Sequence, residues 1–444
     1  MRRPGLCLLA LLCLVCAAGS VPLYRDSLPN GLVLLTYEDP RLPAVDLKFV
    51  CRSGASHDPS GKAGLAGLTN GMLLRGTRTR TAADIDELIE FLGARVRIRG
   101  DHDHQAVEFK LLSRHLDTIL GLLSDIILNP GFGNDELATE RARALSSARY
   151  RYENPGAVAV LEFDRLLFQG HPYARPASGD TVDLKNLERN DLVAFHQTHY
   201  LPNNCFLIAV GDVDHVELGR KVADLFGDWQ PGPVPVLDVP KLSFPEKLTV
   251  KVITRPGLNQ SYVALGNPGI AISHPDMLTV RVMSFILGGS ATASRFGQTV
   301  REAAGLAYDV RCWFDRRTLP GAYRATVQTA DPKAAVGYML RDIGLMIDSS
   351  ATARELEIAQ NYYSGSYPLR YSSARGKLYE VTDMELYGLG SDWLDLFPDR
   401  IRSITLDDIR AAARNHLYPG RHYAVIVTNL SKEDLGLEDV IWVD

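Results

Sequence analysis

Aspartate and histidine alternate in the run Asp101–His104, which is the best candidate for a metal site in the chain. In a strand, His102 and His104 would share one face, because side chains alternate in direction along the backbone. Imidazole and carboxylate groups are common zinc ligands. The sequence places no third ligand beside this pair, so the run is better interpreted as a polar hairpin turn.

The remaining histidines give weaker signals. His196 and His199 are three residues apart, beside Phe195 and Tyr200, and His171 precedes a proline. The aromatic neighbours favour packing or surface roles for the first pair, and a structural role in a loop is expected for His171.

Cysteine spacing excludes two common frameworks. Three of the six cysteines lie in the first 20 residues, and the others are Cys51, Cys205 and Cys312. This odd, widely spaced set forms no disulfide framework and contains no C-x-x-C zinc pair. Its apolar, strand-like surroundings predict buried side chains that act as small hydrophobes.

Arg301 and Tyr308, seven residues apart, are a second candidate for chemistry. We expect Arg301 to end a helix, Gly305 to break it and Tyr308 to begin a strand. A guanidinium and a phenol hydroxyl can donate hydrogen bonds to substrate carbonyls and to a developing oxyanion. The pair also fits an ordinary arginine at a helix end with a half-buried tyrosine.

The elements that must position these residues alternate between strands and helices. The period-two and helical patterns predict, in chain order, strands at 32–35 and 45–50, a helix capped by Thr81, a hairpin over 96–111, helices near 116–123 and 135–152, and a strand at 206–210. After the proline-rich residues 228–246 the same order of elements begins again. This repetition predicts an internal duplication of two similar halves, 21–227 and 247–444, joined by a semi-rigid linker.

Composition places the chain among globular proteins. Of its 444 residues 46% are apolar and 23% are charged, which suffices for sizeable cores. The net charge of −5 lacks the basic excess that a nucleic-acid surface requires.

The first 20 residues have the pattern of a secretory signal peptide. Arginines follow Met1, an apolar run covers Leu6–Ala18, and small residues come next. The run is shorter than the about 20 residues that span a bilayer. We expect cleavage near Ala18–Ser20 and export to the periplasm. Lipid attachment at Cys16 and a buried core helix are the alternatives.

Several segments share their order and spacing with a known family. They are Gly64–Thr77, Gly170–Tyr173, His199–Asn204, Val210–Asp214 and Leu287–Tyr308. Together they resemble the pitrilysin (insulinase) zinc metallopeptidases, and Gly64–Thr77 resembles the active-site helix. The resemblance implies an α+β fold of two homologous halves, each an antiparallel-rich β-sheet covered by α-helices, closing like a clamp.

The catalytic residues of that family are missing. Active members carry H-x-x-E-H, in which two histidines on one helix face bind zinc and the glutamate activates water. The matching positions here are Gly67, Asn70 and Gly71, and the family's third ligand matches Ser146 or Ser147. We therefore expect no metal in this chain. Two glycines within a helix cost about 1 kcal/mol each relative to alanine, so they indicate either close helix packing or a degenerate site.

The resemblance assigns a role to the second candidate pair. In the family, an arginine and a tyrosine with the spacing of Arg301 and Tyr308 face the zinc site from the other half of the chain. We therefore expect a non-catalytic subunit of an exported heterodimeric zinc peptidase, with zinc held only by a catalytic partner carrying H-x-x-E-H. The alternatives are a stand-alone peptide-binding or scaffold protein, and an active metallopeptidase with an unrecognised metal site.

Overall fold

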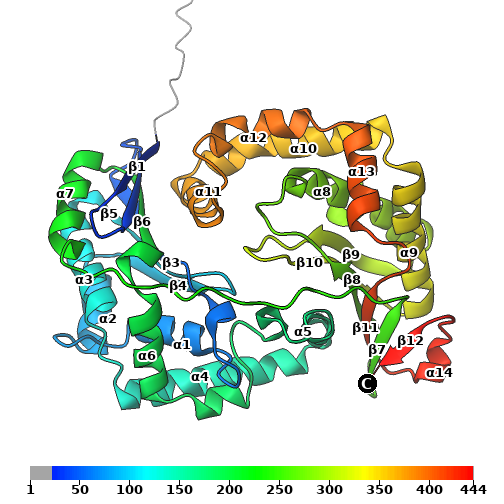
Figure 1. Ribbon diagram of the computed structural model, residues 1–444, viewed down its shortest axis with the longest axis horizontal. Coiled ribbons are helices and arrows are strands. Elements are labelled where there is room, and N and C mark those ends of the chain that lie inside the picture. Colours follow the sequence, from blue (N-terminus) through cyan, green and yellow to red (C-terminus); the bar gives the residue numbers. More distant parts are fainter. Residues whose placement is uncertain (1–22, 444) are drawn as a thin grey trace, which may run out of the picture.

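The computed structural model describes residues 23–443, so the expected signal peptide, with Cys16 and the cleavage site, lies outside the described residues. Residues 23–443 form two mixed six-stranded sheets covered by helices (Figure 1). Among the helices of this part of the chain, none combines the length and the apolar composition that a membrane span requires.

The first sheet combines strands from the beginning and the end of the first half. Its order is β1 (Leu23–Ser27), β2 (Val33–Glu38), β6 (Cys205–Gly211), β3 (Ala44–Cys51), β5 (Gln105–Leu112) and β4 (Arg95–Gly100). Strands β2 and β6 are parallel, and the other neighbours are antiparallel. Strand β4 is therefore one edge of this sheet.

The second sheet repeats this topology. Its order is β12 (Ile441–Val443), β7 (Thr249–Thr254), β11 (Tyr423–Thr428), β8 (Ser261–Pro268), β10 (Ala322–Thr329) and β9 (Ala307–Phe314). Strands β7, β11, β8, β10 and β9 take the places of β2, β6, β3, β5 and β4, and β7 and β11 are again parallel. The predicted fold class, with two similar antiparallel-rich halves, is confirmed.

Helices of the first half follow the predicted order. They are α1 (Leu65–Met72), α2 (Ala82–Phe91), α3 (Leu116–Leu128), α4 (Asn134–Glu153), α5 (Pro155–Leu167), α6 (Arg189–His199) and α7 (His215–Phe226). Thr81 begins α2 as predicted, because its hydroxyl accepts from the amide of Asp84 and the Asp84 carboxylate accepts in return from the Thr81 amide.

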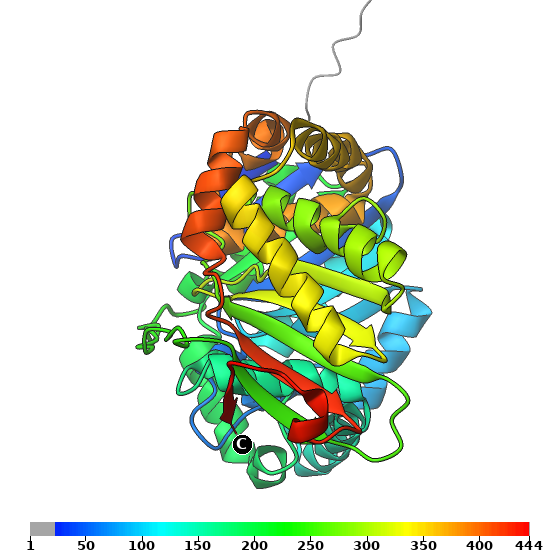
Figure 2. The ribbon, with the colours of Figure 1, turned by 90° about the vertical axis from the view of Figure 1, so that its right-hand side faces the viewer.

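Helices of the second half cover its sheet and extend beyond it. They are α8 (Met277–Ser284), two π-helical turns (Phe285–Gly289 and Gly297–Ala303), α9 (Pro332–Ser349), α10 (Ala353–Tyr371), α11 (Ala374–Tyr387), α12 (Trp393–Arg402), α13 (Leu406–His416) and α14 (Lys432–Leu435). In the turned view, α9 lies across the second sheet (Figure 2). The predicted linker, residues 228–246, contains no helix or strand.

The central strands are buried on both faces. In β6, Phe206 and Ile208 enter one core, and Leu207 and Ala209 enter another. Alternation along a strand separates the two sets, which explains why the segment is apolar at every position. Helices of the same half cover only one face of each sheet, so the second face needs a cover from elsewhere.

Each half supplies one helix to the other half's sheet. Helix α5, from the first half, packs on β8 and β11, and Phe163 shares a core there with Val425. Helix α11, from the second half, packs on β3 and β6, and Leu378 belongs to the core of Val50. This exchange gives the clamp-like arrangement in Figure 1. The division at 228–246 stays a prediction, since α5 precedes the linker but packs on the second sheet.

A buried ion pair lies within this exchange. Arg324 of β10, 2% exposed, donates to Asp164 of α5 at 2.8 Å and to Asp315 at 2.8 Å. Burial raises the pKa of Asp164. Burial acts in the same direction on Asp315, but Arg324 and Arg317 hold the pKa of Asp315 below its ordinary value. Arg324 therefore depends on carboxylates from both halves.

Replacing Asp164 should destabilise the whole molecule. Because Asp164→Ala leaves a buried guanidinium with one carboxylate, we expect a loss of about 3 kcal/mol in the free energy of unfolding, measured by urea titration. The control is Asp117→Ala, whose exposed pair with Lys221 should contribute less than about 1 kcal/mol. Equal losses in both variants would contradict the assignment.

Candidate functional site

The degenerate positions lie on α1, and packing does not require their glycines. A Cβ built at Gly71 meets no atom within 4 Å, and one at Gly67 meets only the Ala177 carbonyl oxygen, at 3.6 Å. Close helix packing, one of the two explanations for these glycines, is therefore wrong. Each of the two positions therefore has room for a Cβ atom.

Asn70, which the resemblance matches to the family's glutamate, forms hydrogen bonds that hold the fold together. Its amide donates to the carbonyls of Arg99 at 2.8 Å and Ala106 at 3.2 Å, and Tyr200 donates to its oxygen at 3.3 Å. The side chain is 1% exposed. Asn70 thus ties α1 to the β4–β5 pair, and a neutral amide cannot take a proton from water.

The position matched to the family's third zinc ligand also carries no side chain that binds zinc. Ser146 and Ser147 are both exposed on α4. The residues at the matched metal positions therefore do not fit zinc. They are two glycines without a side chain, an asparagine whose amide already binds backbone carbonyls, and serines. Carboxylate, imidazole and thiolate ligands are what zinc sites require.

The run Asp101–His104 forms the predicted turn between β4 and β5. Its side chains bind in different directions: His102 to the Arg175 carbonyl at 2.9 Å, His104 to Asp101 at 3.0 Å, and Asp103 to the Tyr173 hydroxyl at 2.5 Å. They do not converge on one point. Burial, with the Arg317 charge, lowers the pKa of His102 to about 4, so the ring is neutral near pH 7.

The other histidines and the cysteines are structural, as expected. His196 meets the Ile127 carbonyl at 2.9 Å, His199 meets the Ser53 hydroxyl at 3.1 Å, and His171 accepts from the amide of Tyr173. Burial lowers the pKa of each of these three histidines to about 4. Cys51, Cys205 and Cys312 are buried and free.

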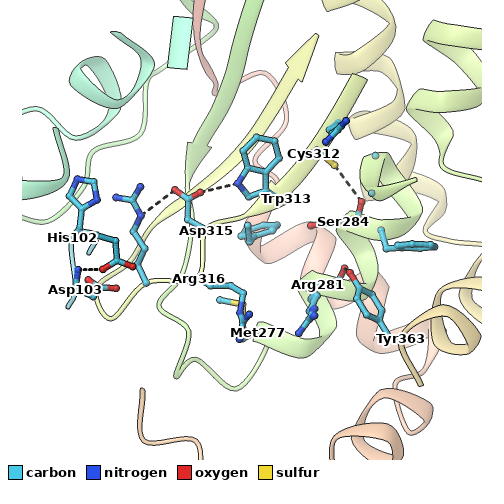
Figure 3. A pocket seen from close by; sticks show the side chains of 17 residues that line it. His102, Asp103, Met277, Arg281, Ser284, Cys312, Trp313, Asp315, Arg316 and Tyr363 are labelled. Carbon is cyan, nitrogen blue, oxygen red and sulfur yellow. Dashed lines mark hydrogen bonds and ion pairs between the residues drawn. The ribbon is translucent and has the colours of Figure 1, made fainter. Parts of the chain in front are cut away.

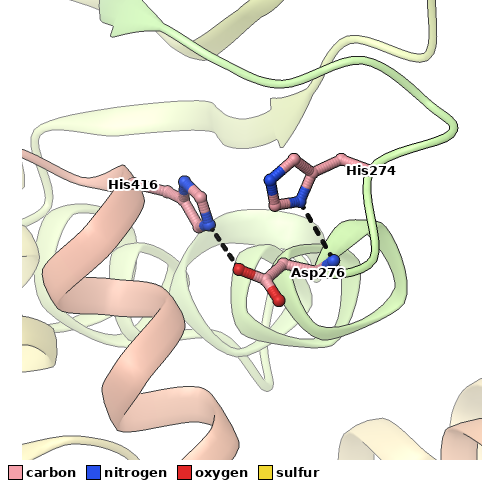
Figure 4. Close-up of side chains that lie close together, drawn as sticks. All are labelled: His274, Asp276 and His416. Carbon is pink, nitrogen blue, oxygen red and sulfur yellow. Dashed lines mark hydrogen bonds and ion pairs between the residues drawn. The ribbon is translucent and has the colours of Figure 1, made fainter.

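One group with metal-like spacing was not predicted. Within residues 23–443, His274, Asp276 and His416 bring ligand atoms within 4.8 Å of one another. His416 Nε2 lies 2.7 Å from Asp276, whose amide donates to His274 Nδ1 at 3.1 Å (Figure 4). Sequence spacing gave no signal, because His416 lies 140 residues from Asp276. The hydrogen bonds already present account for this group as a link between α8 and α13.

The structure places Arg301 beside Tyr308. Arg301 lies in the π-helical turn Gly297–Ala303, Gly305 is left-handed with φ of 63°, and β9 begins at Ala307. The Arg301 guanidinium carbon lies 5.3 Å from the centroid of the Tyr308 ring, and Tyr308 is 85% exposed. Both groups can therefore donate to a molecule outside this chain.

A cavity of about 600 Å³ lies between the halves (Figure 3). The first half contributes the turn at Asp101–Asp103. The second half contributes side chains from α8, β9, the loop after β9 and α10, with four arginines among them: Arg281, Arg311, Arg316 and Arg317. The cavity therefore adjoins β9 and the turn that follows β4, and each of these two strands is an edge of its sheet.

The glycines of α1 allow a direct test of the packing argument. Because nothing blocks a Cβ at Gly71, Gly71→Ala should stabilise the protein by about 1 kcal/mol. Gly64→Ala should destabilise it, because Gly64 has φ of 96° and its Cβ would lie 2.8 Å from the Gly179 Cα. Urea unfolding of both variants is the measurement. Destabilisation by Gly71→Ala would restore the packing explanation.

Comparison with known proteins agrees with this fold. The family described as Insulinase (Peptidase family M16) matches residues 33–180, and Peptidase M16 inactive domain matches residues 186–363, which together exceed half of the chain. An uncharacterized zinc protease of Mycobacterium leprae is 26% identical over 94% of this chain and 95% of its own.

A similar structure and a second relative extend this agreement. The crystal structure of a peptidase M16 inactive domain from Pseudomonas fluorescens matches with a TM-score of 0.86 and 26% identity, covering 92% of this chain and 98% of that one. An uncharacterized zinc protease of Rickettsia bellii is 26% identical over 69% of this chain and 74% of its own. This chain belongs to the peptidase M16 (insulinase) family.

Proposed function

We propose that this chain is a non-catalytic subunit of an exported heterodimeric zinc peptidase. The observation that carries the proposal is the state of α1, where Gly67 and Gly71 offer no ligand atom and Asn70 binds backbone carbonyls. A partner subunit with H-x-x-E-H would hold the zinc. The first 20 residues support export to the periplasm.

In this proposal the chain forms half of a peptide-binding chamber. The unpaired edges of β4 and β9 can each accept an extended peptide as an additional strand, through backbone hydrogen bonds that tolerate many sequences. Arg301 and Tyr308 act on the substrate in the partner's active site. The exposure of Tyr308 supports this role, because an oxyanion donor must be within reach of the substrate. Arg301 donates to the Ala291 carbonyl at 3.3 Å, and its guanidinium has further N–H groups to offer.

Two alternatives lead to different observations. A stand-alone peptide-binding or scaffold protein would purify from its native source without a catalytic homologue. An active metallopeptidase would need its own metal, and His274, Asp276 and His416 are the one group with suitable spacing among residues 23–443. None of these three residues lines the cavity between the halves.

The purified chain alone should cleave no peptide, with or without added zinc. The reason is that Gly67, Asn70 and Gly71 of α1 can neither bind zinc nor activate a water molecule. The measurement is hydrolysis of a quenched fluorescent peptide library, with and without chelator. Chelator-sensitive cleavage that His274→Ala abolishes would establish the active-enzyme alternative instead.

Arg301 and Tyr308 should matter for turnover and not for folding. In the reconstituted pair, Arg301→Ala and Tyr308→Phe should each lower kcat by roughly 10²–10³, the usual effect of losing one oxyanion donor. Each should change the free energy of unfolding by only about 0.5 kcal/mol.

The matched controls are Arg354→Ala and Tyr150→Phe, which alter exposed side chains on α10 and α4. Both controls should leave turnover and melting temperature unchanged. Full activity in the Arg301 and Tyr308 variants, or a loss that follows unfolding, would contradict the assigned roles.

A further inference from the structure

The cavity between the halves continues into a second hollow. This neighbour, of about 490 Å³, shares Arg281, Phe285, Gly289 and Tyr363 with the first cavity. It adds side chains from α10, which are Tyr362, Ser366, Leu369 and Arg370. Arg281 therefore lines both neighbouring hollows, and Arg370 lines the second.

These two arginines lack close carboxylate partners. Among residues 23–443 Arg281 forms no ion pair, and its guanidinium carbon lies over the rings of Tyr363 at 4.7 Å and Phe397 at 5.4 Å. Arg370 reaches only Glu380, at 3.9 Å, and its Nε and Nη2 atoms are buried without hydrogen-bond partners. Burial, then the charges of Arg316 and Arg370, lowers the pKa of Arg281.

The carboxylates around the cavity are bound elsewhere. Asp315 accepts from Arg324 at 2.8 Å, and Asp103 accepts from the Tyr173 hydroxyl and from the amide of Thr318. Asp101 accepts from the amides of the turn that follows it. Among residues 23–443, Glu380 at 3.9 Å from Arg370 is thus the one carboxylate paired with either arginine, and a further negative group can bind beside them.

The lining indicates which negative group fits. A guanidinium binds a carboxylate through two parallel hydrogen bonds, and its planar donors suit this geometry better than a point charge would. Figure 3 shows Met277 and Arg281 from α8 and Tyr363 from α10 on the same side of the cavity. Phe285 and Met277 offer apolar contacts for the methylene groups of an acidic side chain.

We propose that this space is a specificity pocket in which Arg281 and Arg370 bind the carboxylate of a glutamate or aspartate side chain in the peptide substrate. The inference rests on the proposed peptide-binding function and adds the substrate class, acidic peptides. The position of the first hollow beside β9 supports a peptide as the source of the carboxylate, since β9 is an edge strand to which an extended peptide can add.

The test measures binding of labelled peptides to the full chain by fluorescence anisotropy. Three peptides of equal length differ only in a central Glu, Gln or Lys. The Glu peptide should bind about tenfold more tightly than the Gln peptide, which is the effect of one charge-assisted hydrogen bond. Arg281→Gln and Arg370→Gln should each reduce its affinity to that of the Gln peptide.

Two further variants separate recognition from folding. Arg370→Glu, at a side chain 39% exposed, should reverse the preference toward the Lys peptide, which a purely structural arginine would not do. Arg354→Gln on the outer surface of α10 should retain the preference for Glu. Melting curves for every variant establish that it is folded.

The outcomes distinguish this inference from the function on which it rests. Equal binding of the three peptides would overturn the acidic pocket and leave the peptide-binding function standing. Displacement of the Glu peptide by inorganic phosphate, with no preference of Glu over Gln, would assign the pocket to free anions. Absence of binding by the chain and by the reconstituted pair would overturn the proposed function itself.

Discussion

The exchange of α5 and α11 is the interaction on which the rest of the structure depends. The central strands of both sheets are apolar on both faces, so each sheet must be covered twice. Helices of one half cover one face, and a helix from the other half covers the second. Burial of these faces fixes the distance between the halves, and with it the cavity that lies between them.

Helix α1 has a structural role that its hydrogen bonds show directly. Asn70 supplies two hydrogen bonds to the β4–β5 pair, and Asp58 accepts from the amides of Gly64 and Ala66 at the start of the helix. Burial raises the pKa of Asp58 to about 7, against these amide bonds. The helix is thus held in place by its ends and by Asn70, while its former ligand positions carry no side chain.

The polar groups that remain available point to binding more than to chemistry. Tyr308 is an exposed donor at the start of the edge strand β9, with the Arg301 guanidinium beside its ring. Arg281 and Arg370 line neighbouring hollows, where Glu380 at 3.9 Å from Arg370 is the one ion-pair partner among residues 23–443. Guanidinium and phenol groups donate hydrogen bonds, which suits both pairs to binding a ligand.

Local features were decided by the sequence. Thr81 and Asp84 predict the start of α2, Gly305 predicts the break before β9, and the repeated order of elements predicts two similar sheets, because capping, backbone preference and periodicity act over a few residues. The missing zinc ligands were also evident, since the motif is contiguous. The tertiary structure alone decided the exchange of α5 and α11, the bonds of Asn70, the meeting of His274 with His416 and the unpaired state of Arg281. Each of these depends on which distant segments share a core. The free energy of that packing comes from contacts between residues far apart in the chain, so local sequence patterns do not predict it.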